Sequence, residues 1–253
     1  MTVTIAICSQ KGGVAKTTTC LSLGACLAEM GRLVLLIDLD PQTNLTLSMG
    51  LDPTKLRHTV GEALLGNTSL VTVSREGAPF GLDIVPAGPD LAVLEKVLYG
   101  RPNYEFFLER GLEAMDDALY DVVLIDCPPA FGMLTLNALT AADLLIIPTQ
   151  CEFYAANALR RTIELAELVR KKTNPQLVYR VLVTMYDRRN RICEAILAQL
   201  QQGLNGLMFK TIVEVDTKLR ESPVFGEPIT CYAPETRGAQ QYRALAEELI
   251  HRA

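Results

Sequence analysis

Histidine is scarce in this sequence, and closely spaced cysteines are absent. The two histidines, His58 and His251, lie far apart, which argues against a zinc site with histidine ligands at motif spacing. The seven cysteines are scattered singly, and no two are separated by two residues. The odd number of cysteines and the lack of a secretion-signal layout at the N-terminus predict free thiols in a reducing cytoplasm.

Long apolar runs and an excess of positive charge are missing as well. The runs 3–8 and 144–148 are too short to cross a bilayer, so we expect no membrane-spanning helix. The net charge of -5 argues against a surface coated in positive charge, although a local basic patch is compatible with it. With 49% hydrophobic and 21% charged residues, the 253-residue chain has an ordinary globular composition, and we expect one domain over residues 1–253.

Short apolar runs alternate with segments of helical periodicity along the chain. This alternation predicts an α/β fold, with a mostly parallel twisted sheet and helices on both faces. Ligands of such sheets bind beyond the carboxyl ends of the strands. The expected strands are 2–8, 32–40, 82–88, 121–129, 142–150 and 178–187, and the clearest helices are 17–31 and 158–174.

The loop after the first expected strand, SQKGGVAKTTT (9–19), partly matches the phosphate-binding pattern G-x-x-x-x-G-K-[ST]. Lys16 and Thr17 match its end, whereas Gln10 and Ala15 stand at the positions of its two glycines. A lysine here reaches the β- and γ-phosphates of a nucleotide, and the threonine hydroxyl ligates Mg²⁺. Glycines turn backbone N–H groups inward, and the following helix N-terminus attracts anions. The alternative is a plain glycine turn before a helix.

Aspartates close two of the expected strands. Asp126 follows the apolar run at 122–125 and is suited to hold Mg²⁺. Asp38 and Asp40 end the second strand, and strand alternation sends both side chains to one face. We expect Asp40 to orient the attacking water and Asp38 to support Mg²⁺. The alternative is that one of them caps the next segment or only holds a metal-bound water.

Lys11 is an additional lysine ahead of the glycine pair. Two roles are open for it. It pairs with an acid of its own chain, or it reaches a nucleotide that is held by a second copy of the protein, where it acts on the charge that develops there.

Three segments together resemble the ParA/MinD group of ATPases. KGGVAKTT (11–18) is similar to their deviant Walker A motif, LLIDLDPQTNLT (35–46) to their second motif, and DVVLIDCPP (121–129) to their Walker B motif. The similarity covers nearly the whole chain and looks closest to the ParA/Soj branch. It implies ATP and Mg²⁺ as cofactors, catalytic roles for Lys11, Lys16 and Asp40, and metal binding by Thr17, Asp38 and Asp126. The implied nucleotide contacts are Lys11, Gly12, Gly13, Val14, Ala15, Lys16, Thr17 and Thr18 for the phosphates, and Met185, Tyr186, Val215 and Asp216 for adenine.

The resemblance also implies a cycle. ATP forms a sandwich homodimer, the dimer binds non-specific double-stranded DNA, and a ParB-like partner stimulates hydrolysis and release. The implied location is cytoplasmic and nucleoid-associated, and the implied task is to segregate a chromosome, a plasmid or another cargo.

The sequence departs from the family pattern at two places. Ala15 replaces a glycine, where a methyl group could crowd the phosphate. Residues 213–216 read VEVD where relatives often carry a basic run that helps to bind DNA. The expected DNA contacts are therefore Arg188, Arg189, Lys218 and Arg220, and the alternative is that these cations belong to solvated loops.

Three other functions remain open. A MinD-like membrane-positioning ATPase would need a basic amphipathic tail, whereas residues 242–253 are acidic in the middle and predict a packed terminal helix without membrane binding. An electron-transfer ATPase of the nitrogenase iron protein kind would need cluster-ligating cysteines. A metabolic ligase or kinase would need a further substrate pocket.

Overall fold

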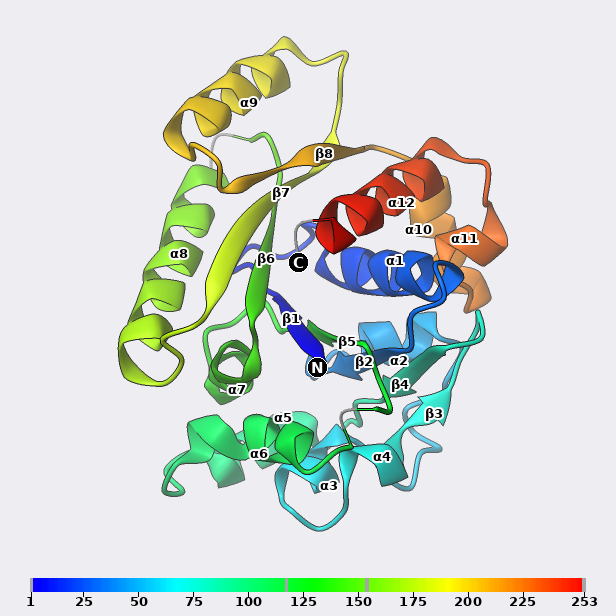
Figure 1. Cartoon of the computed structure of the whole chain (residues 1–253), viewed down its shortest axis with the longest axis vertical. Helices are drawn as coiled ribbons and strands as arrows, with labels where there is room; N and C mark the ends of the chain where they lie inside the picture. Colours follow the sequence, from blue (N-terminus) through cyan, green and yellow to red (C-terminus); the bar gives the residue numbers. More distant parts are fainter. Residues whose placement is uncertain (1, 117, 153–154, 252–253) are drawn as a thin grey trace.

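A twisted sheet of eight strands forms the centre of the part of the chain that the computed structural model describes, residues 2–116, 118–152 and 155–251 (Figure 1). The strand order is β3-β4-β2-β5-β1-β6-β7-β8. Every neighbouring pair is parallel except β3 with β4. The strands are β1 (Val3–Ile7), β2 (Val34–Asp38), β3 (Arg75–Glu76), β4 (Leu82–Val85), β5 (Val122–Asp126), β6 (Leu144–Thr149), β7 (Val178–Tyr186) and β8 (Met208–Glu214).

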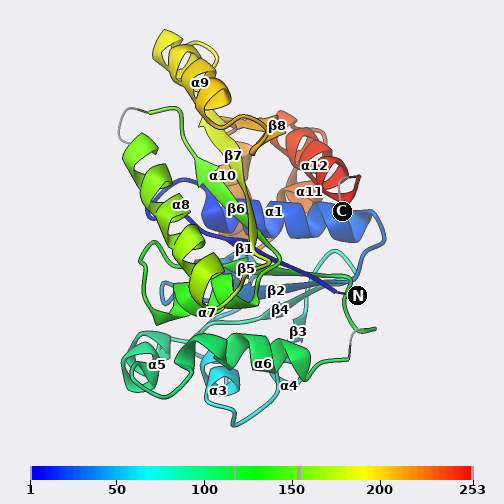
Figure 2. The ribbon, with the colours of Figure 1, turned by 60° about the vertical axis from the view of Figure 1, so that its left-hand side comes forward.

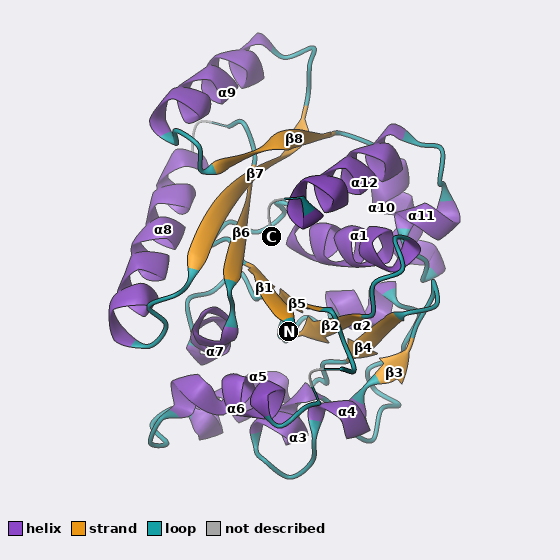
Figure 3. Cartoon of the chain, in the orientation of Figure 1, coloured by secondary structure: helices purple, strands orange, loops and turns teal. Residues whose placement is uncertain are grey.

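Helices cover both faces of the sheet (Figure 3), which confirms the predicted fold class. Figure 2 shows α7 and α8 on one side of the strands and α1 and α12 on the other. The α-helices are α1 (Lys16–Glu29), α2 (Asn44–Ser48), α3 (Val60–Leu64), α4 (Leu70–Val73), α5 (Leu91–Leu98), α6 (Phe107–Glu113), α7 (Met133–Ala141), α8 (Ala155–Lys172), α9 (Arg191–Gly203), α10 (Lys218–Glu221), α11 (Ile229–Tyr232) and α12 (Arg237–Ile250), and the short 3₁₀ turns are η1 (Tyr104–Phe106) and η2 (Ser222–Phe225).

Alternation along the inner strands divides the core into two apolar clusters. In β2, Leu35 and Ile37 face the cluster beneath α3 to α8, whereas Val34 and Leu36 face the cluster beneath α1 and α12. All four side chains are fully buried. Because both faces are covered, these strands read as continuous apolar runs, and for this reason the sequence reveals them.

All six expected strands are present, with shorter bounds, and the helices expected at 17–31 and 158–174 correspond to α1 and α8. The sequence did not predict β3 and β8, which form the two edges of the sheet. An edge strand is partly exposed and includes polar residues, as β8 does in MFKTIVE, so it lacks the continuous apolar run of an inner strand.

The carboxyl ends of the central strands meet at one edge of the sheet. In the strand register, Asp126 lies opposite Ile7 on one side and opposite Asp38 on the other. The loop after β1 therefore starts beside both aspartates. This is the geometry expected for a ligand site in a parallel sheet.

Candidate functional site

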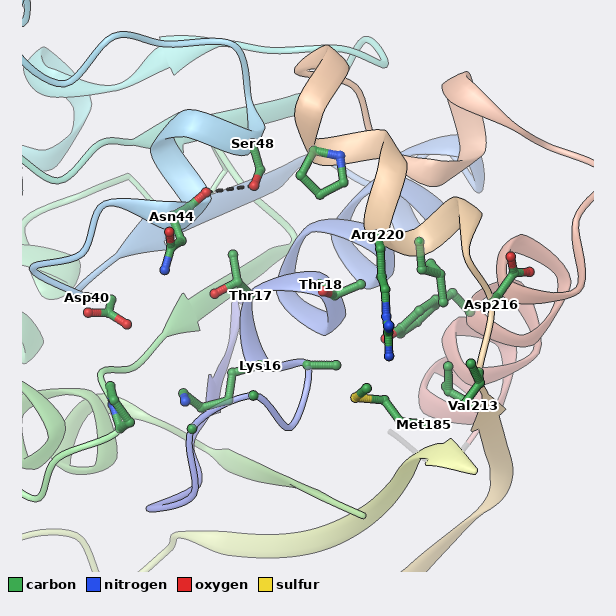
Figure 4. A pocket seen from close by; sticks show the side chains of 18 of the residues that line it. Lys16, Thr17, Thr18, Asp40, Asn44, Ser48, Met185, Val213, Asp216 and Arg220 are labelled. Atoms are coloured by element: carbon green, nitrogen blue, oxygen red, sulfur yellow. Dashed lines mark hydrogen bonds between the residues drawn. The ribbon is translucent and has the colours of Figure 1, made fainter. Parts of the chain in front are cut away.

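A cavity of about 490 Å³ lies at this edge (Figure 4). The loop before α1 forms one end, and residues after β7 and β8 form the other. Its lining residues are Gly12, Gly13, Ala15, Lys16, Thr17, Thr18, Asp40, Gln42, Asn44, Ser48, Pro129, Met185, Val213, Glu214, Val215, Asp216, Leu219, Arg220, Pro223 and Tyr242.

The loop before α1 keeps a tightly curved backbone. Gly13 has φ +71°, a conformation that suits glycine, and a Cβ added at Gly12 or Gly13 would meet no atom within 4 Å. Val14 is only 1% exposed, and its carbonyl accepts a hydrogen bond of 3.0 Å from Thr184 Oγ1. The loop is thus anchored from behind and open toward the cavity.

Ala15 also lies in the left-handed region, with φ 65° and ψ 35°. The sequence pattern has a glycine here in other phosphate loops, and the backbone explains why. A left-handed residue with a Cβ is strained by about 1–2 kcal/mol relative to its usual conformations. The methyl group is accommodated, but at a conformational cost.

The N-terminus of α1 points its first N–H groups into the cavity region. No side chain caps this end of the 14-residue helix, and the first-turn N–H groups of an α-helix have no partner within the helix. Together with the helix dipole they attract an anion. Lys16, which is 7% exposed and lines the cavity, adds a full positive charge. This end of the cavity is therefore suited to bind phosphate groups.

Thr17 and Asp126 are joined directly. The Thr17 hydroxyl donates a hydrogen bond of 2.6 Å to Asp126 Oδ2, while Oδ1 of the same carboxylate is buried with no hydrogen-bond partner among the described residues. Burial and the neighbouring Asp38 raise the pKa of Asp126 well above its usual value. A hydroxyl and an unpaired carboxylate oxygen beside a phosphate site are the donors that Mg²⁺ and its bound waters take, so these residues fit the ion.

Both carboxylate oxygens of Asp38 accept hydrogen bonds from neighbouring residues of the same chain. Its Oδ1 accepts the N–H of Asp40 at 3.0 Å, and its Oδ2 accepts both the N–H and the hydroxyl of Thr46, at 2.9 and 2.7 Å. Burial raises the pKa of Asp38 to about 6, against the lowering effect of these hydrogen bonds. The residue braces the loop between β2 and α2. Its predicted support of Mg²⁺ stays a prediction, and the sequence did not single out Thr46.

Asp40, in contrast, lines the cavity. Its Oδ1 accepts the N–H of Gln42 at 3.0 Å, and the side chain lies at the phosphate end of the cavity in Figure 4. Asn44 and Ser48 of α2 lie beside it along the wall and were not predicted. The position of Asp40 suits the orientation of a water near the terminal phosphate.

Lys11 is held within its own chain. Its ammonium group donates to Gln150 Oε1 at 2.7 Å and also forms an ion pair with Glu152. The amide nitrogen of Gln150 donates to the Gly13 carbonyl at 3.0 Å and contacts the sulfur of Met185. Gln150 thus links the lysine, the loop and the opposite end of the cavity, and the sequence analysis assigned it no role.

Three of the four residues expected near adenine line the far end of the cavity, namely Met185, Val215 and Asp216. Met185 has φ 52°, which turns the chain at the end of β7. Tyr186 lines a separate cavity on the other side of this segment. Its backbone carbonyl accepts the N–H of Val215 at 3.1 Å and holds that strand end in place.

Three of the four cations expected to contact DNA are engaged in ion pairs. Arg188 pairs with the buried Glu214, Arg189 binds Asp187 through two nitrogens, and Lys218 pairs with Glu221 at 2.6 Å. Arg220 lines the cavity itself.

The C-terminal helix α12 packs onto the core, as the sequence predicted for residues 242–253, of which 252–253 lie outside the described residues. Tyr242, Leu245 and Ala246 are fully buried, and the Tyr242 hydroxyl lies 3.0 Å from Thr19 Oγ1 of α1. Of the helices in the described part of the chain, none is long and apolar enough to span a membrane. All seven cysteines are free, and only Cys231 is exposed.

Comparisons with known proteins agree with this geometry. A family model described as an AAA domain matches residues 2–179. The sporulation initiation inhibitor protein Soj of Bacillus subtilis is 39% identical over 97% of this chain and 97% of its own length. The chromosome partitioning protein ParA of Caulobacter vibrioides is 39% identical over 98% of this chain and 94% of its own. A structure named cobyrinic acid a,c-diamide synthase from Mycobacterium smegmatis, with a bound ATP analogue and magnesium, is 38% identical, covers 99% of this chain and 95% of its own, and superposes with a TM-score of 0.87.

Proposed function

This chain belongs to the ParA/Soj group of the ParA/MinD ATPases, and we propose that it binds ATP and Mg²⁺ in the cavity at the strand ends and hydrolyses ATP to ADP and phosphate. The family makes it a partitioning or positioning ATPase. The observation that carries the proposal is the hydrogen bond between Thr17 and Asp126 at the N-terminus of α1, together with the second oxygen of Asp126, which has no hydrogen-bond partner in the described part of the chain. We propose that residues 1–253 form a single ATPase domain.

In this proposal the residues of the chain have distinct tasks. The first-turn N–H groups of α1 and the Lys16 ammonium hold the β- and γ-phosphates. Thr17 and Asp126 hold Mg²⁺, which supplies neutralisation of the phosphate charge. Asp40 orients the water that attacks the terminal phosphate. The backbone N–H of Asp40 donates to the Asp38 carboxylate, which holds Asp40 in place.

ATP binding then brings two copies together, and Lys11 of each copy reaches the nucleotide of the other. Support comes from the present partners of Lys11. Its ion pair joins side chains that are 25% and 59% exposed, and such exposed pairs contribute only about 0–1 kcal/mol. A phosphate group of the other subunit is a stronger partner for the lysine. The exchange of partners therefore costs little.

The ATP-bound dimer binds non-specific double-stranded DNA, and a ParB-like protein stimulates hydrolysis and release. Arg188, Arg189 and Lys218 are the proposed DNA contacts. Because each of them now pairs with an acid, DNA phosphates must replace these acids, and the affinity must fall steeply with salt. The protein would reside in the cytoplasm on the nucleoid, as the names of its relatives suggest.

A gel-shift and crosslinking experiment with non-specific duplex DNA tests this cycle. The protein is examined without nucleotide, with ADP, and as Asp40→Ala with ATP. We expect a dimer and DNA binding only with ATP, and retention of both in the variant, because it binds ATP without hydrolysing it. Lys16→Ala with ATP serves as the control and should stay monomeric and free of DNA. Equal DNA binding in all conditions would contradict the cycle.

A ligase is the second candidate, because the 38% identical structure carries the name of a cobyrinic acid a,c-diamide synthase. A ligase that couples ATP cleavage to amide formation depends on its acceptor substrate. Turnover of ATP that rises with DNA and requires no corrin substrate would favour the partitioning ATPase. Turnover only with cobyrinic acid and a nitrogen donor would favour the ligase.

A further inference from the structure

Arg220 lies at the base end of the cavity. It belongs to α10, and its side chain extends from this helix into the cavity (Figure 4). In that view it lies between Thr18 and Val213, whereas Asp40 lies beyond Thr17 on the other side. The guanidinium group therefore lies away from the end where Lys16 holds the terminal phosphates.

The guanidinium group of Arg220 has no hydrogen bond or ion pair to any other residue in the described part of the chain. Its neighbour Lys218 differs, since it pairs with Glu221 and lies 5.6 Å from the ring centroid of Tyr232. An arginine that reaches into a cavity without a protein partner keeps its flat face and its five donors available for a ligand.

The backbone that carries Arg220 is firmly held. Leu219, the preceding residue, is 7% exposed and packs in the core. The N–H of Lys218 donates to Asp216 Oδ1 at 2.9 Å, and Glu221 accepts the Tyr232 hydroxyl at 3.0 Å. The backbone position from which the Arg220 side chain starts is thus fixed beside the cavity.

Apolar side chains lie near Arg220. Met185 and Val213 lie on its side of the cavity in Figure 4, and Leu219 and Pro223 also belong to the lining. Apolar walls suit a flat aromatic base more than a charged phosphate, and a guanidinium group stacks favourably on an aromatic face. Two carboxylates of the lining are already engaged, since Asp216 accepts two backbone N–H groups and Glu214 pairs with Arg188 and Arg237.

We propose that Arg220 is a nucleotide-binding residue whose guanidinium group stacks on the adenine base. This inference rests on the proposed ATPase function and deepens it. It assigns Arg220 to the nucleotide, instead of the DNA contact that the sequence suggested. Because ADP and ATP share the same base, Arg220 contributes equally to the binding of both.

Binding of Mg-ADP, of a non-hydrolysable Mg-ATP analogue and of inorganic tripolyphosphate tests this role, measured by calorimetry or by displacement without DNA. Stacked arginine–aromatic contacts are worth roughly tenfold in affinity, so Arg220→Ala should weaken both nucleotides by about tenfold. Its affinity for tripolyphosphate should stay unchanged. Arg220→Lys should recover little of the loss, since an ammonium group lacks the planar face. Arg110→Ala on α6, an exposed arginine outside the cavity, is the matched control and should bind as the wild type does.

Each other outcome has a defined meaning. A loss confined to the ATP analogue, an equal loss for tripolyphosphate, full recovery by Arg220→Lys, or no loss at all overturns base stacking by Arg220. Melting without nucleotide should not change in Arg220→Ala, because the side chain has no partner among the described residues, and a lower melting temperature would point to a structural role instead. If the wild type binds neither nucleotide, the proposed ATPase function fails, and this inference fails with it.

Discussion

The Thr17 hydroxyl donates a hydrogen bond of 2.6 Å to Asp126, and the second oxygen of that carboxylate is buried without a hydrogen-bond partner in the described residues. A buried carboxylate oxygen that lacks a hydrogen-bond partner destabilises the folded protein. A bound cation and its waters would supply the missing partner and offset the cost of burying this carboxylate.

Asp126→Asn should therefore raise the free energy of unfolding and weaken metal binding at the same time. Without metal and nucleotide, we expect the variant to be more stable by about 1 kcal/mol, because the desolvation of a buried charge disappears. Mg-dependent ATP binding should weaken at least about tenfold, since one anionic oxygen is lost. Denaturant unfolding and calorimetry check the two effects.

Asp121→Asn is the control for this change. Asp121 is exposed, accepts the N–H of Leu33 at 2.8 Å and lies at the opposite ends of the strands. It should alter neither metal nor nucleotide binding. A destabilised Asp126→Asn variant with normal Mg-ATP affinity would contradict the proposed metal site.

Lys11→Ala should bind ATP with nearly the affinity of the wild type, because in the single chain its ammonium group pairs with Gln150 and Glu152. Turnover should fall by about 100-fold, since a cation that acts on the transition state in trans is missing. Steady-state ATPase assays at saturating ATP check this. Glu152→Gln, which removes the competing acid, should dimerise at lower ATP concentration. Unchanged turnover in Lys11→Ala would remove the trans role.

Ala15→Gly should stabilise the protein by about 1 kcal/mol, because it relieves the left-handed alanine. Urea unfolding without nucleotide measures the change. Ala28→Gly, within the same helix, should destabilise by about 1 kcal/mol or more, since its backbone is helical. If both variants lose stability, then the backbone at position 15 is not strained.

Thr46→Val should destabilise the protein by about 3 kcal/mol, because it removes a hydrogen bond to the buried Asp38 and the acceptor of the Ala87 N–H. Thr54→Val is a close control, since Thr54 donates its N–H and its hydroxyl to Asp52 on the surface, as Thr46 does to the buried Asp38. There the change should stay below about 0.5 kcal/mol. Equal losses in thermal melts of both variants would mean that Asp38 does not depend on Thr46.

Local sequence patterns were sufficient to predict most strands of the fold and the residues at the phosphate end of the cavity. The inner strands are buried on both faces and read as apolar runs, and the loop, Lys16, Thr17 and Asp126 follow motif positions. Thr17 and Asp126 are in direct contact, and their predicted sharing of a metal ion stays a prediction.

Residues whose role depends on distant parts of the chain were not predictable. The sequence assigned no role to Gln150, and the packing of β6 against β1 is what brings it to Lys11. Arg220 lines the cavity because α10, whose first residue bonds Asp216, packs beside it. The sequence shows only the charge of Arg220, and this charge suggested a DNA contact.

The side chain of Gln150 connects Lys11 to both ends of the cavity. Its carbonyl oxygen is occupied by Lys11 while its NH₂ group bonds Gly13 and contacts Met185. If Lys11 leaves for a second subunit, as proposed, the amide loses its contact to the lysine and keeps those to Gly13 and Met185. Its orientation is then less restrained at the point where it joins the phosphate loop to the other end of the cavity. In the proposed cycle, subunit pairing and nucleotide binding are therefore linked through a single amide.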